Sequence, residues 1–191
     1  MPSSPSERHT KGDVCQNAIA RLAVSYIKES QTVFIGGLAI HCVMMKSLPK
    51  HIRFTVVTNS MEVACYLRNV ENVQPYAVGG NVKSSGNITD SLANEFVKQF
   101  TVDACFANAT GLSTKGLSTA TPEVPSSTKP IMTMQRKITL IEYSKFGVDL
   151  LSNMYLLKGL HIIITDEETS QENIDIIQSL GIEVVVAKGE E

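Results

Sequence analysis

Small and polar residues occur at regular intervals in this chain, each group directly after a short apolar run. They are Gly36, Gly37, Thr58, Asn59, Ser60, Gly79, Gly80, Gly111 and Lys145. Glycines let a ligand approach the backbone, hydroxyl and amide groups form hydrogen bonds, and a lysine supplies positive charge. These residue types are typical of a site for a small polar or anionic ligand. Turn conformation alone also favours Gly, Asn and Ser, so a purely structural interpretation stays open.

Signatures of common enzyme chemistries do not occur in the sequence. It contains neither the G-x-x-x-x-G-K-[ST] phosphate-binding loop nor a G-x-S-x-G nucleophile elbow, and Gly36-Gly37 lacks the spacing of a dinucleotide fingerprint. No two histidines stand at i, i+4, and we interpret His41 and His161 as packed or hydrogen-bonded side chains in preference to ligands or bases. Lys145 is interpreted as a phosphate-pairing or surface residue in preference to a catalytic amine. We therefore expect no catalytic residue, no metal and no cofactor.

The charge balance restricts the classes of partner. The 191 residues include 17 Lys and Arg against 19 Asp and Glu, a net charge of −2. Recognition of a phosphate backbone requires a basic surface, so we expect no direct DNA binding by this chain alone. No apolar run reaches the roughly 18 residues that span a bilayer, and residues 1–13 lack the apolar segment of a signal peptide. The sequence thus predicts a cytoplasmic protein with no membrane contact.

The four cysteines are not arranged as disulfide or zinc ligands. They are Cys15, Cys42, Cys65 and Cys105, and none belongs to a C-x-x-C pair. Because each has apolar neighbours, the pattern predicts four small core side chains with reduced thiols.

The elements that must position the candidate residues alternate between strand and helix. The predicted strands are 32–35, 54–57, 74–78, 102–107, 138–141, 162–164 and 183–187. Apolar spacing predicts helices over 14–29 and 38–46, with further helices capped by Asn59 or Ser60, by Asp90, and by a capping box of Thr169 and Glu172. Ligands of open α/β sheets bind at the carboxyl ends of the strands, where the candidate residues fall.

Continuously apolar strands that alternate with helices indicate a mostly parallel sheet with helices on both faces. We therefore predict one α/β domain over residues 14–191, preceded by a flexible lead-in over 1–13. Between Thr110 and Lys129 the chain is rich in Gly, Ser, Thr and Pro, and Pro125 and Pro130 make any helix there short or kinked.

Eight short segments, taken in order and with their spacing, resemble the C-terminal sensor domain of DeoR-family bacterial transcription regulators. The segments are Ile19-Ala20 with Ala23, Thr55-Val56-Val57-Thr58-Asn59-Ser60, Val78-Gly79-Gly80-Asn81-Val82, Val102-Asp103-Ala104-Cys105-Phe106, Thr110-Gly111-Leu112, Gly116-Leu117-Ser118-Thr119, Ser144-Lys145-Phe146-Gly147 and Ile163-Ile164-Thr165-Asp166. The resemblance runs from about Cys15 to Ala187. It implies the Rossmann-like fold shared by ribose-5-phosphate isomerase and coenzyme A transferases. It also implies binding of a phosphorylated sugar or related metabolite, which changes the DNA affinity of an attached winged helix-turn-helix.

The resemblance also points to two departures from the family. The N-terminal helix-turn-helix has no counterpart in these residues, which implies either a truncated product or a regulator half that acts without its own DNA reader. The family's turn after the first strand reads roughly Asp-Ser-Gly-Thr-Thr and holds the ligand's phosphate. The aligned residues here are Gly36, Gly37, Leu38, Ala39 and Ile40. We therefore expect weak or no binding of ordinary sugar phosphates, and stronger binding after the combined changes Gly36→Asp, Leu38→Gly, Ala39→Thr and Ile40→Thr.

Two alternatives to an effector-sensing domain stay open. One is a sugar-phosphate isomerase-like enzyme of the same fold, and the other is an oligomerisation module with a vestigial pocket. We further expect a homo-oligomer, because the apolar stretches Val43-Met44-Met45 and Met154-Tyr155-Leu156-Leu157 exceed what one small sheet must cover.

Overall fold

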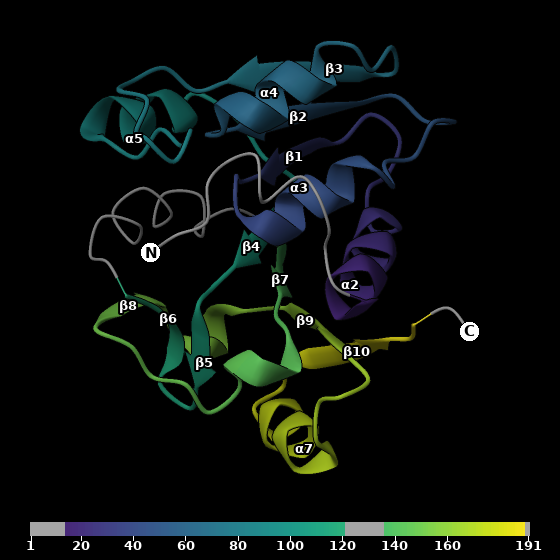
Figure 1. The fold of residues 1–191 in the computed structure, drawn as a ribbon, viewed down its shortest axis with the longest axis vertical. Helices are drawn as coiled ribbons and strands as arrows, with labels where there is room; N and C mark the ends of the chain where they lie inside the picture. Colours follow the sequence, from purple (N-terminus) through teal and green to yellow (C-terminus); the bar gives the residue numbers. More distant parts are fainter. Residues whose placement is uncertain (1–13, 121–135, 190–191) are drawn as a thin grey trace.

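A seven-stranded parallel sheet forms the centre of the computed structural model, which describes residues 14–120 and 136–189. Its strands are β1 (Thr32–Ile35), β2 (Phe54–Thr58), β3 (Val73–Ala77), β4 (Ala104–Asn108), β7 (Arg136–Leu140), β9 (Ile162–Asp166) and β10 (Glu183–Ala187). They are ordered β10-β9-β7-β4-β1-β2-β3, from bottom to top in Figure 1. All seven predicted strands are present: β1 and β10 have the predicted ends, and the ends of the other five differ by at most two residues.

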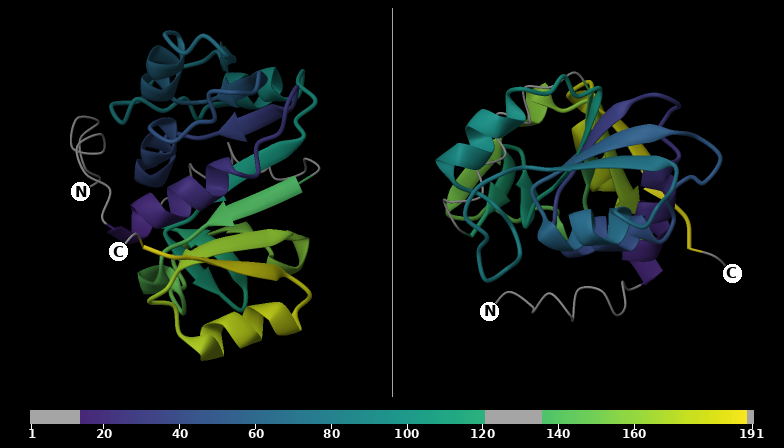
Figure 2. Two further views of the ribbon diagram at one scale, coloured as in Figure 1. Left: turned by 90° about the vertical axis from the view of Figure 1, so that its right-hand side faces the viewer. Right: turned by 90° about the horizontal axis from the view of Figure 1, so that it is seen from above.

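Helices cover both faces of this sheet. They are α2 (Val14–Val24), α3 (Ala39–Met45), α4 (Met61–Leu67), α5 (Ser91–Val97) and α7 (Gln171–Ser179), with short 3-10 turns η1 (Tyr143–Lys145) and η2 (Leu157–Gly159). Buried side chains of α2, α3 and α4 share one core with one face of the sheet, and those of α5 and α7 share the other. Figure 2 shows α2 and α4 on one side of the sheet and α5 on the other. The predicted α/β class and mostly parallel sheet are confirmed.

A second, smaller sheet was not predicted. It is antiparallel and consists of β5 (Gly111–Ser113), β6 (Gly116–Thr119) and β8 (Ser152–Tyr155), in the order β5-β6-β8. Leu112, Leu117 and Met154 pack from it onto the same core as α5. The strands are three or four residues long, too short for a readable alternation of apolar and polar positions, and β8 joins from a distant part of the chain.

The cysteine prediction is half right. Cys42 and Cys105 are buried, Cys15 is partly buried and Cys65 is exposed. Burial raises the pKa of the Cys105 thiol to about 12, against the opposing effect of nearby Lys137, so this thiol stays protonated and unreactive. Cys65 lies on the outward face of α4, which needs only Val63 and Leu67 to pack against the sheet.

Helix ends and caps show where local patterns were reliable. Ser60 and Asp90 cap α4 and α5 as expected, by accepting the backbone N–H of Val63 and Ala93. The predicted capping box of the last helix is wrong, because Ser170 is the N-cap. The Thr169 hydroxyl is instead buried against that of Thr165, at 2.6 Å. The first helix ends at Val24 and not near residue 29.

The apolar stretches that suggested self-association are mostly internal. Val43, Met44 and Met45 are all buried, since α3 lies between α2, α4 and the sheet. Met154 and Leu157 are buried as well, and only Leu156 is largely exposed, at 58%. This basis for a homo-oligomer is therefore wrong. The predictions for residues 1–13, Pro125, Lys129 and Pro130 lie outside the described residues.

Candidate functional site

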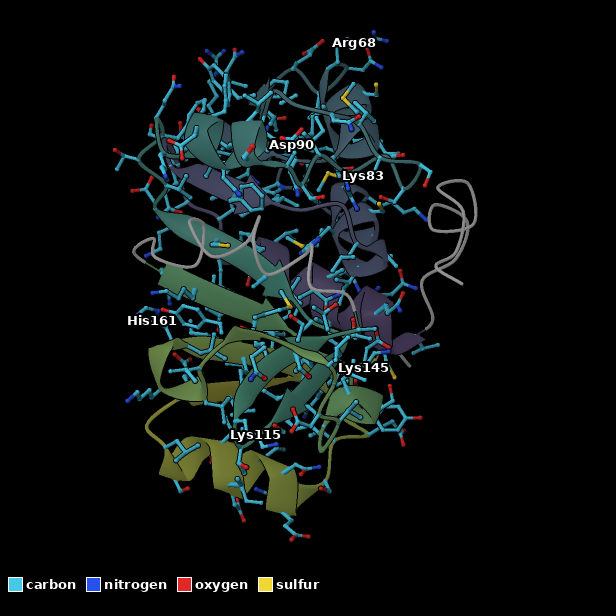
Figure 3. All side chains as sticks on the ribbon, turned by 90° about the vertical axis from the view of Figure 1, so that its left-hand side faces the viewer. Arg68, Lys83, Asp90, Lys115, Lys145 and His161 are labelled. Atoms are coloured by element: carbon cyan, nitrogen blue, oxygen red, sulfur yellow. The ribbon has the colours of Figure 1, made fainter. Side chains whose placement is uncertain are left out.

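The order of the strands reverses between β1 and β4, which is where open α/β sheets bind ligands. From β1 the chain adds β2 and β3 on one side, and then continues from β4 on the other side. The turns at the carboxyl ends of these strands therefore lie along one edge of the sheet. Figure 3 shows Lys83 and Lys145 on this side of the molecule, and His161, which precedes β9, on the opposite side. The turns that follow β1, β2 and β3 thus lie at the same edge of the sheet as η1, which carries Lys145.

The turn from β1 into α3 is stabilised by a histidine that follows it. Gly36 and Gly37 are buried, and Leu38 is the N-cap of α3, although its side chain cannot cap. The Leu38 backbone N–H donates to Nδ1 of His41 at 3.3 Å. The ring lies so close to Gly36 that a Cβ at that residue would be 3.1 Å from both Cε1 and Nδ1. His41 therefore acts like the third-residue side chain of a capping box, which reaches back and accepts the backbone N–H of the N-cap residue.

Burial lowers the pKa of His41 to about 4, and the nearby Phe106 carbonyl opposes this shift only in part. The ring is only 3% exposed, and its Nε2 has no hydrogen-bond partner of acceptable geometry among the described residues. His41 is consequently neutral at pH 7, with Nδ1 available as an acceptor.

This shift predicts an acid-dependent loss of stability. Because the folded pKa is below the unfolded value of 6.5, the unfolded chain binds the proton first. The contribution of His41 is complete above pH 6.5, and about 3 kcal/mol is lost as the pH falls towards 4. Urea denaturation of the native chain and of His41→Gln at pH 7 and 4.5 measures this loss of unfolding free energy, which should be smaller in the variant. His51→Gln is the control, because His51 is exposed. The His51 variant should keep the native pH dependence; equal pH dependence in both variants would contradict the assignment to His41.

The loop between β3 and α5 folds over the ends of β1 and β2. Asn59 donates from Nδ2 to the Ile88 carbonyl at 3.3 Å, and the Ile88 N–H donates to the Asn59 carbonyl at 2.8 Å. Asn87 pairs with Ser60 in an isolated bridge, and its buried Oδ1 has no hydrogen-bond partner among the described residues. A Cβ on Gly37 would collide with that oxygen and with Ser60. Glycine at residue 37 therefore lets the loop close over the turn.

The hydroxyl groups after β2 are engaged within the protein. Thr58 is fully buried, and its Oγ1 accepts the Ser60 N–H at 3.1 Å. Ser60 is 1% exposed, accepts the Val63 N–H at 3.4 Å and donates to Glu62 Oε2 at 3.0 Å. These hydroxyls start α4, so a ligand would have to contact Asn59 or the backbone at this turn.

The two glycines after β3 differ in their surroundings. Gly79 has open space where a side chain would lie, whereas Gly80 has φ +142° and faces Asp90. The Asp90 carboxylate accepts the N–H of Ala93 at 3.0 Å and of Asn81 at 2.5 Å. These hydrogen bonds lower the pKa of Asp90, the Ala93 bond most, with Lys83 adding a smaller effect. Gly80 thus serves the cap of α5.

Gly111 and Lys145 belong to the part of the edge near β4 and β7. A Cβ on Gly111 would lie 2.5 Å from the Val148 carbonyl, so this glycine lets the segment between η1 and β8 pack closely on the small sheet. Lys145 is partly exposed in η1 and forms no ion pair with another described residue. The preceding Tyr143 N–H donates to Oδ2 of buried Asp166 at 2.9 Å, which holds η1 against the end of β9.

The structure brings together Gly36, Gly37, Asn59 and Ser60 and adds His41 and Asn87 to them. Asn87 gave no local signal, because its role depends on the return of a loop. His41 had one: it stands three residues after the N-cap residue Leu38, where a capping-box side chain reaches back. No three His, Cys, Asp or Glu side chains of the described residues are grouped to hold a metal ion. Within residues 14–120 and 136–189, no helix has the length and apolarity to span a membrane.

These features define a class, a parallel α/β domain with a strand reversal at the carboxyl edge of its sheet. Solved structures share the fold: the chain superposes on ribose 5-phosphate isomerase A from Neisseria gonorrhoeae with a TM-score of 0.52 at 11% identity, covering 72% of this chain and 55% of that one. The chain spans only about half of that enzyme, so the likeness concerns the fold alone.

The chain belongs to the DeoR C-terminal sensor domain family, whose model matches residues 15–167. It is 27% identical over 182 residues to the HTH-type transcriptional repressor GlcR of Bacillus subtilis strain 168, covering 92% of this chain and 69% of that protein. It is 26% identical over 151 residues to the glycerol-3-phosphate regulon repressor of Escherichia coli K12, covering 78% of this chain and 60% of that protein. The resemblance read from the sequence is confirmed.

Proposed function

We propose that this domain senses a metabolite for a DeoR-type regulator of sugar metabolism, binding a phosphorylated sugar or a related metabolite at the carboxyl edge of its sheet. The observation that carries the proposal is the strand reversal between β1 and β4 with Gly36, Gly37 and Asn59 grouped beside it. Relatives named as a transcriptional repressor and as the repressor of a glycerol-3-phosphate regulon support a regulatory role. Non-enzymatic action is part of the same proposal.

Each candidate residue has a distinct proposed contribution. The backbone of Gly36 and Gly37, with Asn59, contacts the ligand directly, and Lys145 supplies charge. Thr58 and Ser60 position the turn, because their hydroxyls are engaged in it. Gly79 gives access to the edge, and Gly80 and Gly111 allow close packing beside it.

A thermal-shift screen of hexose phosphates, pentose phosphates, glycerol 3-phosphate and their unphosphorylated parents tests the proposal. A ligand at 100 times its Kd should add about 2.7 kcal/mol to the unfolding free energy. For an anionic ligand, Lys145→Gln should weaken binding about tenfold or more, the loss of one charge-assisted hydrogen bond. Lys158→Gln, an exposed lysine of η2 near the opposite edge, is the matched control. A stabilising ligand that tolerates Lys145→Gln and Asn59→Ala alike would place the site elsewhere.

An isomerase-like activity is the second candidate, because the fold is shared with ribose-5-phosphate isomerase. Turnover of ribose 5-phosphate by the purified chain, abolished by Asn59→Ala, would support it and displace the sensing role.

The proposed partners include a second copy of this chain and exclude direct DNA contact by these residues, since the net charge is −2. Light scattering and a gel-shift assay at about 150 mM salt test these two points.

A further inference from the structure

The backbone N–H at the start of α3 already has an acceptor inside the protein. Turns at a strand reversal bind phosphate when their N–H groups are free. Here the Leu38 N–H is directed at Nδ1 of His41, 3.3 Å away. A ring nitrogen that accepts a hydrogen bond carries no proton, so the proton of the neutral ring is on Nε2.

The ring has little freedom to give up this position. His41 is 3% exposed within a helix whose side chains are almost all buried. On the side of the turn, Gly36 leaves just enough room: a Cβ there would be 3.1 Å from the ring. A phosphate oxygen approaching the Leu38 N–H would meet the lone pair of Nδ1, and two acceptors facing one donor repel each other.

We propose that His41 is the specificity-determining residue of the β1–α3 turn and that it excludes phosphate there, so that the effector presents an uncharged hydroxyl group, which can also donate a hydrogen bond, to this turn. The inference rests on the proposed function, because it concerns the ligand of the same edge. A phosphate group of the ligand, where there is one, lies away from the turn, on the side of Lys145.

Gly36 and His41 depend on each other, because only glycine leaves room beside the imidazole ring. Ile40 is 1% exposed and points into the core with α2, so Ile40→Thr would bury its hydroxyl rather than offer it to a ligand. Gly36→Asp would crowd the imidazole, because its Cβ would lie 3.1 Å from the ring. The four-residue change expected to restore phosphate binding is therefore insufficient while His41 is present.

Two measurements test the exclusion. Long-range ¹H–¹⁵N spectra of the native chain at pH 7 should show Nδ1 of His41 unprotonated and Nε2 protonated. Titration with inorganic phosphate should leave the Leu38 amide resonance unchanged in the native chain, and His41→Ser should bind phosphate at least about tenfold more tightly, as one freed charge-assisted hydrogen bond allows. Cys42→Ser, a buried change on the same helix that keeps the ring, is the matched control and should behave as native.

A protonated Nδ1, or a Leu38 amide that shifts with phosphate in the native chain, would overturn the proposal. The spectra need no variant, so the test holds if His41→Ser does not fold. A native chain that binds no sugar of the panel, while the spectra and His41→Ser behave as expected, would refute the proposed function and leave the phosphate exclusion standing.

Discussion

A Gly37→Ala variant is expected to lose about 3 kcal/mol of unfolding free energy, because the site has no room for a methyl group. The new Cβ would lie 2.5 Å from the Cβ of Ser60 and closer still to Oδ1 of Asn87. Ser60 is 1% exposed and caps α4, so it cannot move without loosening the start of that helix. Urea denaturation measures the loss. Hydrogen exchange at the Ile88 amide, which is bonded to Asn59, reports whether the loop has opened.

Gly79→Ala is the matched control for this prediction. Apart from its two chain neighbours, no described residue has an atom within 4 Å of its Cβ position, and its φ is outside the left-handed region. The control should gain about 0.4–1 kcal/mol, because alanine restricts the unfolded chain. A Gly37→Ala variant as stable as Gly79→Ala would show that the β3–α5 loop does not close over the β1–α3 turn. Gly37→Ala should also lose ligand binding, since the β3–α5 loop forms part of the carboxyl edge of the sheet.

Replacing Asp166 by alanine is expected to cost about 4 kcal/mol, because two backbone donors lose a charged acceptor. This carboxylate is 1% exposed and accepts the Tyr143 N–H at 2.9 Å and the Glu168 N–H at 3.1 Å. It thereby ties η1, which carries Lys145, to the end of β9. Denaturation of the variant measures the loss, and faster exchange of the Tyr143 amide locates it.

Glu168→Ala is the control for Asp166, two residues away in the same turn. Its side chain is exposed, so the expected change is within about 0.5 kcal/mol. Asp166→Asn keeps one acceptor oxygen and should fall between the two. If Asp166→Ala and Glu168→Ala cost the same, the buried carboxylate does not hold η1 in place.

The seven main strands could be predicted from the sequence because a strand buried on both faces reads as a continuous apolar run. Val33, Phe34 and Ile35 show this, since Phe34 faces one core and its neighbours face the other. Asp90 and Ser60 were predicted as caps for a related reason: a cap acts on N–H groups two or three residues away. Apolar runs and helix caps both involve residues that are close neighbours in the sequence.

The tertiary structure decided which of these local features meet. The sequence placed glycines, hydroxyls and an amide at the ends of strands, but only the strand order set β1 beside β4 and made their turns neighbours. The loop carrying Asn87 covers Gly37 from fifty residues away, and Val43, Met44 and Met45 are internal because α2, α4 and the sheet surround α3. Capping and periodicity act over a few residues, whereas such contacts depend on chain segments that meet only after the sheet has formed, and no window of sequence contains both partners.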